Sequence, residues 1–554
     1  MKSLLRNVAV VAIVLAACGT AHAQKSWNVA TGNWNTAGNW SPSGVPASGN
    51  AVAISNDGTA TLDATSSGLT SLTIGTSSSV LQKDSSTSGR TITMNNTAGN
   101  GLVTNSGTIR YGQGSTGEFR ITSGPLGVNN SGLVTADVAG AELRLTMSNI
   151  NGTDLVNSGT LRADSGLLRF AGSSNFDLVN SGGVLSAING GTINFASGGR
   201  VTGGTISVAA GSTLQHSRTN DRTDLTDVTV TNAGRMLVDN ALNNQGLAIN
   251  FLGNTTLTNS GTLEYLTSGV LAPTSSGSAA SGAAITNQAT GIIRVFNNNT
   301  AGTATARFTN STSGFTNLGG IEIKSNSLLA TGSSQFVSTD VNFSNAGSFL
   351  VDGPVSSISM TGRTFTQTAG SLSLISGGSM TASSVLINGG TLLGNGTIAA
   401  PTTIGGILSP GNAAIGTLTV SNNVTWNAGN AWLFQLGTPA ASLNDAITGS
   451  DADLLSLTGA FTQGNGSTFT FDFAAGGSDG WYKLVDYTST NFTPGTNTSF
   501  AATNVPAGKS ANFVVDPGST ALYVQVVPEP STLALAGLGI GLAGLIASRR
   551  RRRG

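Results

Sequence analysis

The residues of this chain that could do chemistry are few. Its only cysteine is Cys18 and its two histidines are His22 and His216. Cys18 and His22 fall in an N-terminal leader, so the exported chain would keep one histidine and no cysteine. This argues against a thiol nucleophile, a zinc site built on Cys or His, and a disulfide scaffold. A Ser-His-Asp triad could form only through His216.

One charged cluster lies near that histidine: Arg218 and the segment Asp221-Arg222-Thr223-Asp224-Leu225-Thr226-Asp227. Aspartates beside a basic side chain are the groups with which some enzymes cleave polysaccharides, using calcium or acid and base. The three aspartates are spaced by three, so an extended chain would place Asp221 and Asp227 on one side and Asp224 on the other. The spacing therefore favours a solvated loop over a site.

A second acidic group consists of Asp445, Asp451 and Asp453. It fits no EF-hand loop, because the required glycine and the terminal glutamate are missing, and calcium binding remains the alternative interpretation. The glycines form no phosphate loop, since GxxxxGK[ST] does not occur. The sequence thus predicts no catalytic residue, no metal site and no cofactor.

The composition points away from an ordinary soluble enzyme. Of 554 residues only 9% are charged, 76 are glycine and 38% are hydrophobic, whereas globular proteins carry about 25% charged residues. Lys2, Arg6 and the terminal arginines hold much of the positive charge, so the body between them is slightly acidic. A nucleic-acid partner is not expected for such a body.

A repeat runs through the body. An apolar residue is followed after one position by Asn, then by Gly, then by an apolar run, as in Val103-Thr104-Asn105-Ser106-Gly107-Thr108-Ile109. The motif recurs at Asn157, Asn180, Asn232, Asn259, Asn317, Asn345 and Asn388, with looser copies at Asn130, Asn287 and Gln367. Many intervals are 21 to 30 residues, the range of a stacked-coil protein with loops of variable length.

The chemistry of this unit predicts its structure. Asn and Gly tolerate left-handed backbone angles and would make a corner, and the β-branched residues after them would form a short strand. Such a strand cannot bury its apolar face alone, but coils stacked at about 4.8 Å would pair every strand and fill one interior. Equivalent asparagines could form a hydrogen-bonded ladder. We expect a right-handed parallel β-helix of about 15 coils.

This interpretation divides the chain into five parts. They are a signal peptide (1–23), an N-terminal cap (24–59), parallel β-helix repeats (60–427), a C-terminal β region (428–526) and a sorting segment (527–554). In the cap, Trp27, Trp34 and Trp40 would cover the first coil, with an aromatic sugar-stacking platform as the alternative. In the C-terminal region, alternating aromatic residues such as Phe469, Phe471 and Phe473 predict antiparallel strands.

The passage from Gly389-Gly390-Thr391-Leu392 through Gly405-Gly406-Ile407-Leu408 to Gly416-Thr417-Leu418-Thr419-Val420 resembles the autotransporter-associated β-strand repeat of secreted β-helical proteins. The resemblance implies a β-helix and says almost nothing about activity. No translocator barrel follows the repeat, so the resemblance does not imply the autotransporter route of secretion.

The N-terminus reads as a secretory signal peptide. Lys2 and Arg6 precede an apolar run, and Ala21-His22-Ala23 supplies a small-x-small cleavage site before Gln24. We expect cleavage between Ala23 and Gln24. The alternative is a lipobox, Leu15-Ala16-Ala17-Cys18, which would leave Cys18 lipidated at the mature N-terminus.

The C-terminus has three parts in a fixed order. Val527-Pro528-Glu529-Pro530 is followed by the apolar stretch 533–547, and the chain then ends in Arg549, Arg550, Arg551, Arg552, Arg553 and Gly554. The apolar stretch is short for a membrane-spanning helix, and the arginines would remain in the cytoplasm as a membrane stop. This order resembles a PEP-CTERM sorting signal, which implies export by a Gram-negative bacterium and processing at Pro528, Glu529 and Pro530 by an exosortase, a membrane transpeptidase.

The sequence therefore predicts a non-catalytic structural protein of the cell envelope or extracellular matrix, anchored transiently in the inner membrane and associated with exopolysaccharide. The alternatives are a β-helical polysaccharide lyase or hydrolase and a surface adhesin. An enzyme would need carboxylates and basic residues gathered across several coils in a groove.

Overall fold

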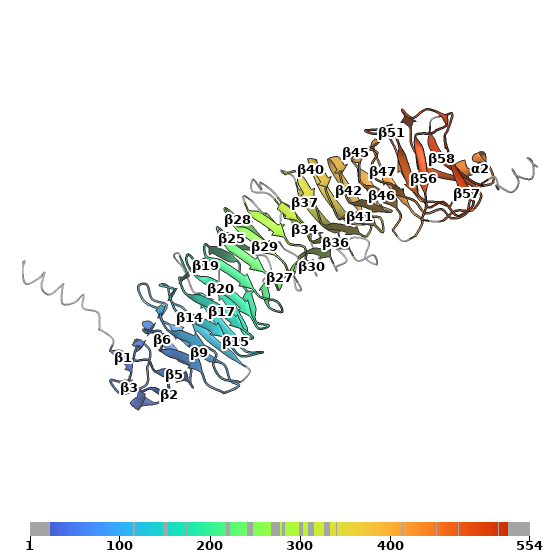
Figure 1. Cartoon of the computed structure of the whole chain (residues 1–554). Helices are drawn as coiled ribbons and strands as arrows, with labels where there is room; N and C mark the ends of the chain where they lie inside the picture. Colours follow the sequence, from blue (N-terminus) through green and yellow to red (C-terminus); the bar gives the residue numbers. More distant parts are fainter. Residues whose placement is uncertain are drawn as a thin grey trace, which may run out of the picture. The chain divides into compact units, whose positions relative to one another are not determined.

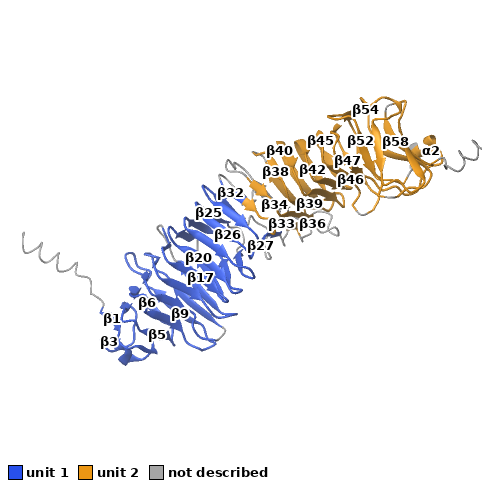
Figure 2. Cartoon of the chain, viewed as in Figure 1, with its two compact units in different colours: residues 1–285 blue, residues 286–554 orange. Residues whose placement is uncertain are grey.

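The computed structural model describes residues 23–529, except 115–116, 148–152, 173–175, 218–221, 241–247, 268–277, 280–282, 298–302, 309–314, 326–332, 339–340, 413, 450, 475 and 519. The chain divides into an N-terminal unit, residues 1–285, and a C-terminal unit, residues 286–554 (Figure 2). Each unit is a parallel β-solenoid. Within the described residues the two units together contain about 16 turns, close to the 15 expected.

Three parallel sheets form the walls of the N-terminal unit, and each coil after the first contributes one strand to each wall (Figure 1). The first sheet contains β1 (Gln24–Trp27), β4 (Ala51–Ile54), β7 (Ser71–Ile74), β10 (Leu102–Asn105), β13 (Val128–Asn130), β16 (Leu155–Asn157), β19 (Phe176–Val179), β22 (Gly199–Thr202), β25 (Arg222–Thr226) and β28 (Ala248–Leu252), with β3 (Trp40–Ser41) antiparallel at its edge.

The second sheet contains β2 (Thr31–Asn33), β5 (Thr59–Leu62), β8 (Val80–Lys83), β11 (Thr108–Arg110), β14 (Leu133–Ala136), β17 (Thr160–Asp164), β20 (Val184–Ile188), β23 (Thr205–Val208), β26 (Thr229–Asn232) and β29 (Thr256–Asn259). The third contains β6 (Ser66–Leu69), β9 (Arg90–Met94), β12 (Glu118–Thr122), β15 (Glu142–Met147), β18 (Leu167–Gly172), β21 (Thr192–Phe195), β24 (Thr213–His216), β27 (Arg235–Asn240) and β30 (Thr262–Thr267).

The strands alternate between buried and outward residues, which is the pattern of a wall with one wet face. In β15, for example, Leu143, Leu145 and Met147 are buried while the residues between them are partly exposed. Inside the solenoid, Phe170, Phe176 and Phe195 come from neighbouring coils, and their ring centroids lie 5.4 to 6.0 Å apart. A continuous apolar interior therefore holds the coils together, as the repeat predicts.

In the C-terminal unit one wall contains β33 (Ile292–Asn297), β36 (Gly320–Ser325), β39 (Ser348–Asp352), β41 (Ser371–Ile375), β43 (Thr391–Gly394) and β46 (Ile407–Pro410). The other two walls are separate parallel ladders that share the long strands β40 (Ser356–Gln367) and β42 (Ser379–Ile387). One also contains β34 (Thr303–Phe308), β37 (Ser333–Ser338), β44 (Thr397–Ala399) and β47 (Thr417–Val420). The other also contains β35 (Phe315–Asn317), β38 (Phe343–Asn345), β45 (Thr402–Ile404) and β48 (Val424–Trp426).

The expected region boundaries differ from the observed pairing at both ends. Parallel pairing begins before residue 60, because β4 already pairs in parallel with both β1 and β7. It also continues past residue 427 through β50 (Leu454–Leu457), β51 (Ala460–Gln463) and β54 (Ser489–Thr490), and through the small sheet of β49 (Trp432–Leu433), β52 (Phe469–Asp472) and β56 (Phe500–Thr503). The expected antiparallel strands are therefore confirmed near the C-terminus, but they share residues 428–526 with parallel strands.

Antiparallel pairing in that region is a closing element. It involves β53 (Gly480–Asp486), β55 (Gly495–Thr496), β57 (Lys509–Val515) and β58 (Ala521–Pro528). Phe469, Phe471 and Phe473 alternate because they line the interior together with Trp426 and Trp432, whose rings stack 3.6 Å apart. Alternating buried and exposed residues indicate a strand with one buried face. Strands of a parallel coil and strands of an antiparallel sheet both have such a face.

The three N-terminal tryptophans are buried, each at most 3% exposed, and Trp40 contacts both others edge to face at 4.9 and 4.8 Å. The Nε1–H of Trp40 donates to the Trp34 carbonyl oxygen at 2.8 Å. A sugar-stacking platform needs exposed ring faces. The arrangement therefore favours the cap that the sequence indicates over the platform.

Candidate functional site

The repeated asparagines form the expected ladder. Buried Asn105, Asn130, Asn157 and Asn180 stand in successive coils, and each Nδ2 donates to the next Oδ1 at 2.6 to 2.7 Å. Asn232 donates to Asn259 in the same way. In the C-terminal unit a second series is formed by Asn287, Asn317, Asn345 and Gln367, with bonds of 2.5 to 2.8 Å.

Asn388 does not join this series. Its side chain is exposed, and Ile387 occupies the position in register with Gln367. The ladder asparagines are also absent from the described residues with positive φ, so the left-handed corner expected from the motif is wrong for them. The glycine of the motif is required because successive coils approach too closely here for a side chain. A Cβ at Gly159 would lie 2.2 Å from the Gly132 carbonyl oxygen.

A row of polar side chains crosses the outer face of the first sheet. Asp177, Arg200, Asp224 and Asn250 occupy the same register position in β19, β22, β25 and β28. They face outward because their chain neighbours, including Leu178, Val201 and Leu225, are buried in the interior. Strand alternation and coil stacking alone bring these four side chains side by side.

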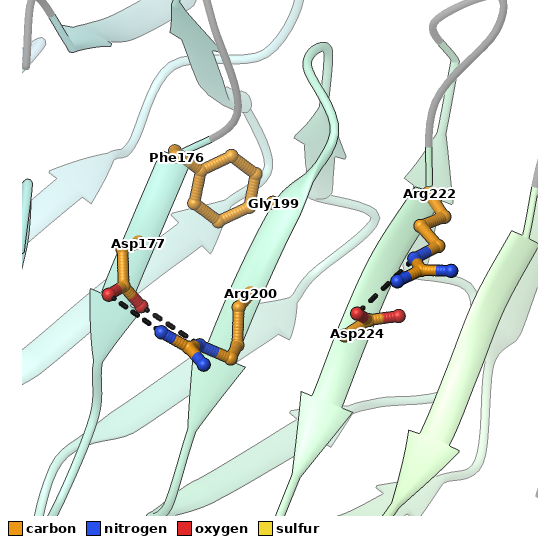
Figure 3. Close-up of a pocket in the computed structure, with 6 residues that line it drawn as sticks. All are labelled: Phe176, Asp177, Gly199, Arg200, Arg222 and Asp224. Carbon is orange, nitrogen blue, oxygen red and sulfur yellow. Dashed lines mark hydrogen bonds and ion pairs between the residues drawn. The ribbon is translucent and has the colours of Figure 1, made fainter.

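The row is held by ion pairs and hydrogen bonds (Figure 3). Arg200 Nε and Nη2 lie 3.3 and 3.1 Å from the two carboxylate oxygens of Asp177. Arg222 Nε lies 3.3 Å from Asp224 Oδ2, and Asn250 Nδ2 donates to Asp224 Oδ1 at 2.6 Å. The hydrogen bond and charge of Asp177 raise the pKa of Arg200 above its ordinary value. We call Asp177, Arg200, Arg222 and Asp224 the sheet patch.

These side chains line a shallow hollow of about 260 Å³ together with Phe176 and Gly199. The side chains of Arg200 and Arg222 are 57% and 66% exposed, so much of each guanidinium faces solvent. Carboxylate acceptors alternate with guanidinium donors, which suits a ligand rich in hydroxyl groups. Phe176 is buried in the core and offers no open face for stacking on a sugar ring.

Several groups that sequence reasoning placed together are separate. His216 lies inside the solenoid with no exposed surface, and its Nδ1 is 3.0 Å from Thr223 Oγ1. Asp224 faces outward on the same strand as Thr223. The solvated loop expected at 221–227 is also wrong, since Arg222–Thr226 is strand β25 of the first sheet. Arg218 and Asp221 lie outside the described residues.

The second acidic group is dispersed as well. Asp445 lies in the first turn of α2 (Leu443–Gly449) and accepts a hydrogen bond from Ser442 Oγ at 2.7 Å. Asp453 is buried, and its carboxylate accepts the backbone N–H groups of Gly416 and Gln435 at 2.9 and 2.7 Å. Burial raises the pKa of Asp453 to about 6 despite those bonds. Asp451 is exposed. In the described part of the chain, no group of three His, Cys, Asp or Glu side chains is placed to hold a metal ion.

Sequence reasoning missed a second charged row, on the outer face of the third sheet. Glu118 pairs with Arg120 at 2.5 Å and with Arg144 at 3.6 Å, and Glu142 pairs with Arg169 at 3.6 Å. Burial opposes ionisation of Glu118, but the bond with Arg120 and the nearby guanidiniums outweigh it and lower its pKa. The signal was readable as Glu-x-Arg at 118–120 and again at 142–144.

The last described residues carry the start of the C-terminal motif. β58 ends at Pro528, opposite Lys509 of β57, and the Glu529 backbone N–H donates to the Gly508 carbonyl oxygen at 2.7 Å. The side chains of Pro528 and Glu529 are exposed. Residues 526–552 match the PEP-CTERM protein-sorting motif.

The PEP-CTERM motif indicates an exported, cell-surface protein and implies processing by an exosortase. No curated protein is significantly similar to this chain. Pro530, the apolar stretch 533–547, the arginines 549–553 and residues 1–22 of the predicted signal peptide lie outside the described residues. Within the described residues, no helix has the length and apolar character to span a membrane. β1 begins at Gln24, the residue expected after signal cleavage.

Proposed function

We propose that this chain is a non-catalytic structural protein of the cell envelope or extracellular matrix, exported by a Gram-negative bacterium and processed by an exosortase-type transpeptidase. The observation that carries the proposal is a PEP-CTERM motif at the end of a β-solenoid. A solenoid offers repeated outer faces, stabilised from coil to coil, on which a matrix can be organised. We also propose that its coils are right-handed, as parallel crossovers nearly always are.

Exopolysaccharide is the proposed partner. The sheet patch supports this, because it presents hydrogen-bond donors and acceptors on a rigid face that three successive coils define. Residues 389–420, which resemble the autotransporter-associated β-strand repeat, support a secreted scaffold. The expected leader (1–23), with cleavage between Ala23 and Gln24 or lipidation at Cys18, would start export. The apolar stretch 533–547 and Arg549 to Arg553 would hold the precursor in the inner membrane until processing.

The experiment follows an internally tagged full-length chain in cells with and without the sorting enzyme. We expect the released form to lack peptides from residues 533–548 by mass spectrometry. Glu529→Ala should leave a membrane-retained precursor, and removal of the five arginines should misplace the chain. Peptides from 533–548 on the released extracellular form would show that the proposal is wrong.

The second candidate function is a β-helical polysaccharide lyase or hydrolase, and the sheet patch is the observation that favours it. A general base must be free to take a proton, yet each patch carboxylate is held by an arginine. We therefore propose binding without turnover. Release of unsaturated or reducing ends by purified protein, lost in Asp224→Ala and retained in Asp445→Ala, would favour the enzyme. An adhesin differs only in having one specific ligand.

A further inference from the structure

The sorting motif begins inside a folded strand. β58 lies antiparallel between β53 and β57. Its pairing with β53 ends at Val526, opposite Gly480, whereas its pairing with β57 continues to Pro528. Glu529 adds one more backbone bond, to the Gly508 carbonyl oxygen. No linker therefore separates the antiparallel sheet from Pro528 and Glu529, the first two residues of Pro-Glu-Pro.

Gly508 stands at the turn that leads into β57. Its φ is +76°, and the Lys509 backbone N–H closes the turn on the Pro506 carbonyl oxygen at 3.1 Å. The Lys509 ammonium group lies 3.1 Å from Asp479 Oδ1, and this ion pair links the turn to the residue that precedes β53. A Cβ at Gly508 would meet no atom within 4 Å. A side chain there is therefore sterically allowed but would strain a left-handed backbone.

We propose that β57 withholds the sorting motif, so that Pro528 and Glu529 must detach from β57 before the sorting enzyme can bind the motif as a free extended segment. Binding as a free extended segment requires backbone groups that are not already paired, and those of Pro528 and Glu529 are paired with β57 and Gly508. Strand ends open locally far more often than a whole unit unfolds. Gly508 is then a positioning residue that sets how often the motif is free. This inference rests on the proposed processing at the motif.

The test measures the half-time of processing by pulse–chase of the tagged full-length chain in cells that contain the sorting enzyme. One variant carries Gly-Ser-Gly-Ser between Val527 and Pro528, which moves the motif away from β57. The matched control carries the same insert between Pro517 and Gly518, in the turn between β57 and β58. We expect processing about five- to tenfold faster in the first variant and unchanged in the control, since one net hydrogen bond changes an equilibrium by about fivefold.

A point substitution tests the role of Gly508 separately. Gly508→Ala should speed processing about fivefold by straining the turn that presents its carbonyl oxygen, and Gly508→Asn should restore the wild-type rate because Asn tolerates left-handed angles. The thermal midpoint of the purified body should differ little among these variants, so that general destabilisation is not the cause.

The outcomes separate this inference from the proposed function. Equal or slower processing of the variant with the spacer before Pro528 would overturn the withholding of the motif while leaving the sorting function intact. If both the wild-type chain and the spacer variant stay unprocessed in cells that contain the enzyme, the proposed function itself is overturned.

Discussion

Replacing Asn130 by alanine tests whether the asparagine ladder stabilises the coils. Asn130 accepts a hydrogen bond from Asn105 and donates one to Asn157, both at 2.7 Å, and it is only 2% exposed. Its neighbour Asn129 lies on the same strand and faces outward. Both residues are asparagines of the same strand, and they differ in the face of the sheet on which the side chain lies.

The magnitude follows from the bonds lost. The two ladder hydrogen bonds at about 1 kcal/mol each account for about 2 kcal/mol, and an unpaired buried group adds about 1 to 3 kcal/mol. The longer bonds from Asn130 Nδ2 to the Gly132 and Thr160 carbonyl oxygens, at 3.2 and 3.3 Å, are lost as well. The group left unpaired is the Asn157 side-chain oxygen, because Asn105 keeps a second acceptor in the Leu133 carbonyl oxygen. We expect Asn130→Ala to lower the free energy of local unfolding by about 4 kcal/mol. Asn129→Ala should change it by about 0.5 kcal/mol or less.

Native-state hydrogen exchange with mass spectrometry is the assay, because a solenoid need not unfold in one step and the loss should concentrate in adjacent coils. Amide exchange in β10, β13 and β16 should accelerate by about a thousandfold in Asn130→Ala, at roughly 1.36 kcal/mol per tenfold. Asn105→Ala should cost about 2 to 4 kcal/mol, because it removes one ladder bond instead of two and leaves the buried Asn130 side-chain oxygen unpaired. Equal effects of Asn129→Ala and Asn130→Ala would refute the argument.

Three further outcomes are expected. Because burial raises the folded pKa of Asp453 to about 6 against an ordinary 3.8, the folded unit binds a proton that the unfolded chain has released between these two values. The unfolding free energy should therefore fall by about 2 kcal/mol as pH rises from about 4 to 6, and a slope that persists in Asp453→Asn would contradict this. Gly159→Ala should destabilise its coils by about 1 to 3 kcal/mol by pressing a Cβ against the preceding coil, whereas Gly114→Ala, with open space around it, should be nearly neutral by the same exchange measurement. Trp426→Leu should remove near-ultraviolet circular dichroism from the pair with Trp432 and lower the urea midpoint of the C-terminal unit; an unchanged midpoint would show that the stack contributes little.

The repeat of Asn, Gly and β-branched residues was enough to predict a stacked-coil protein and a ladder, because both properties follow from local chemistry repeated at one period. It was not enough to place the ladder. Asn105, Asn130 and Asn157 end strands of the first sheet, whereas Asn232 and Asn259 end strands of the second. The same motif serves at the strand ends of the first sheet and at those of the second. Both places need a buried amide side chain and a residue small enough for the backbones of successive coils to approach closely.

The sheet patch could not be predicted from spacing. Asp177, Arg200 and Asp224 lie more than twenty residues apart, and loops of unequal length separate their strands, so only coil register aligns them. The segment around Asp224 looked like a loop because its charges hid a strand whose buried residues are Thr223 and Leu225.

The sorting motif, the scarcity of reactive groups and the β-solenoid class could all be predicted from the chain, because they depend on composition, on contiguous motifs and on a repeated local pattern. Three features became visible only in the folded protein: which outward side chains meet across coils, where parallel coils end in an antiparallel sheet, and the pairing of Pro528 with β57. Those features depend on the register between segments far apart in the chain, and register is set by the packing of all the coils together.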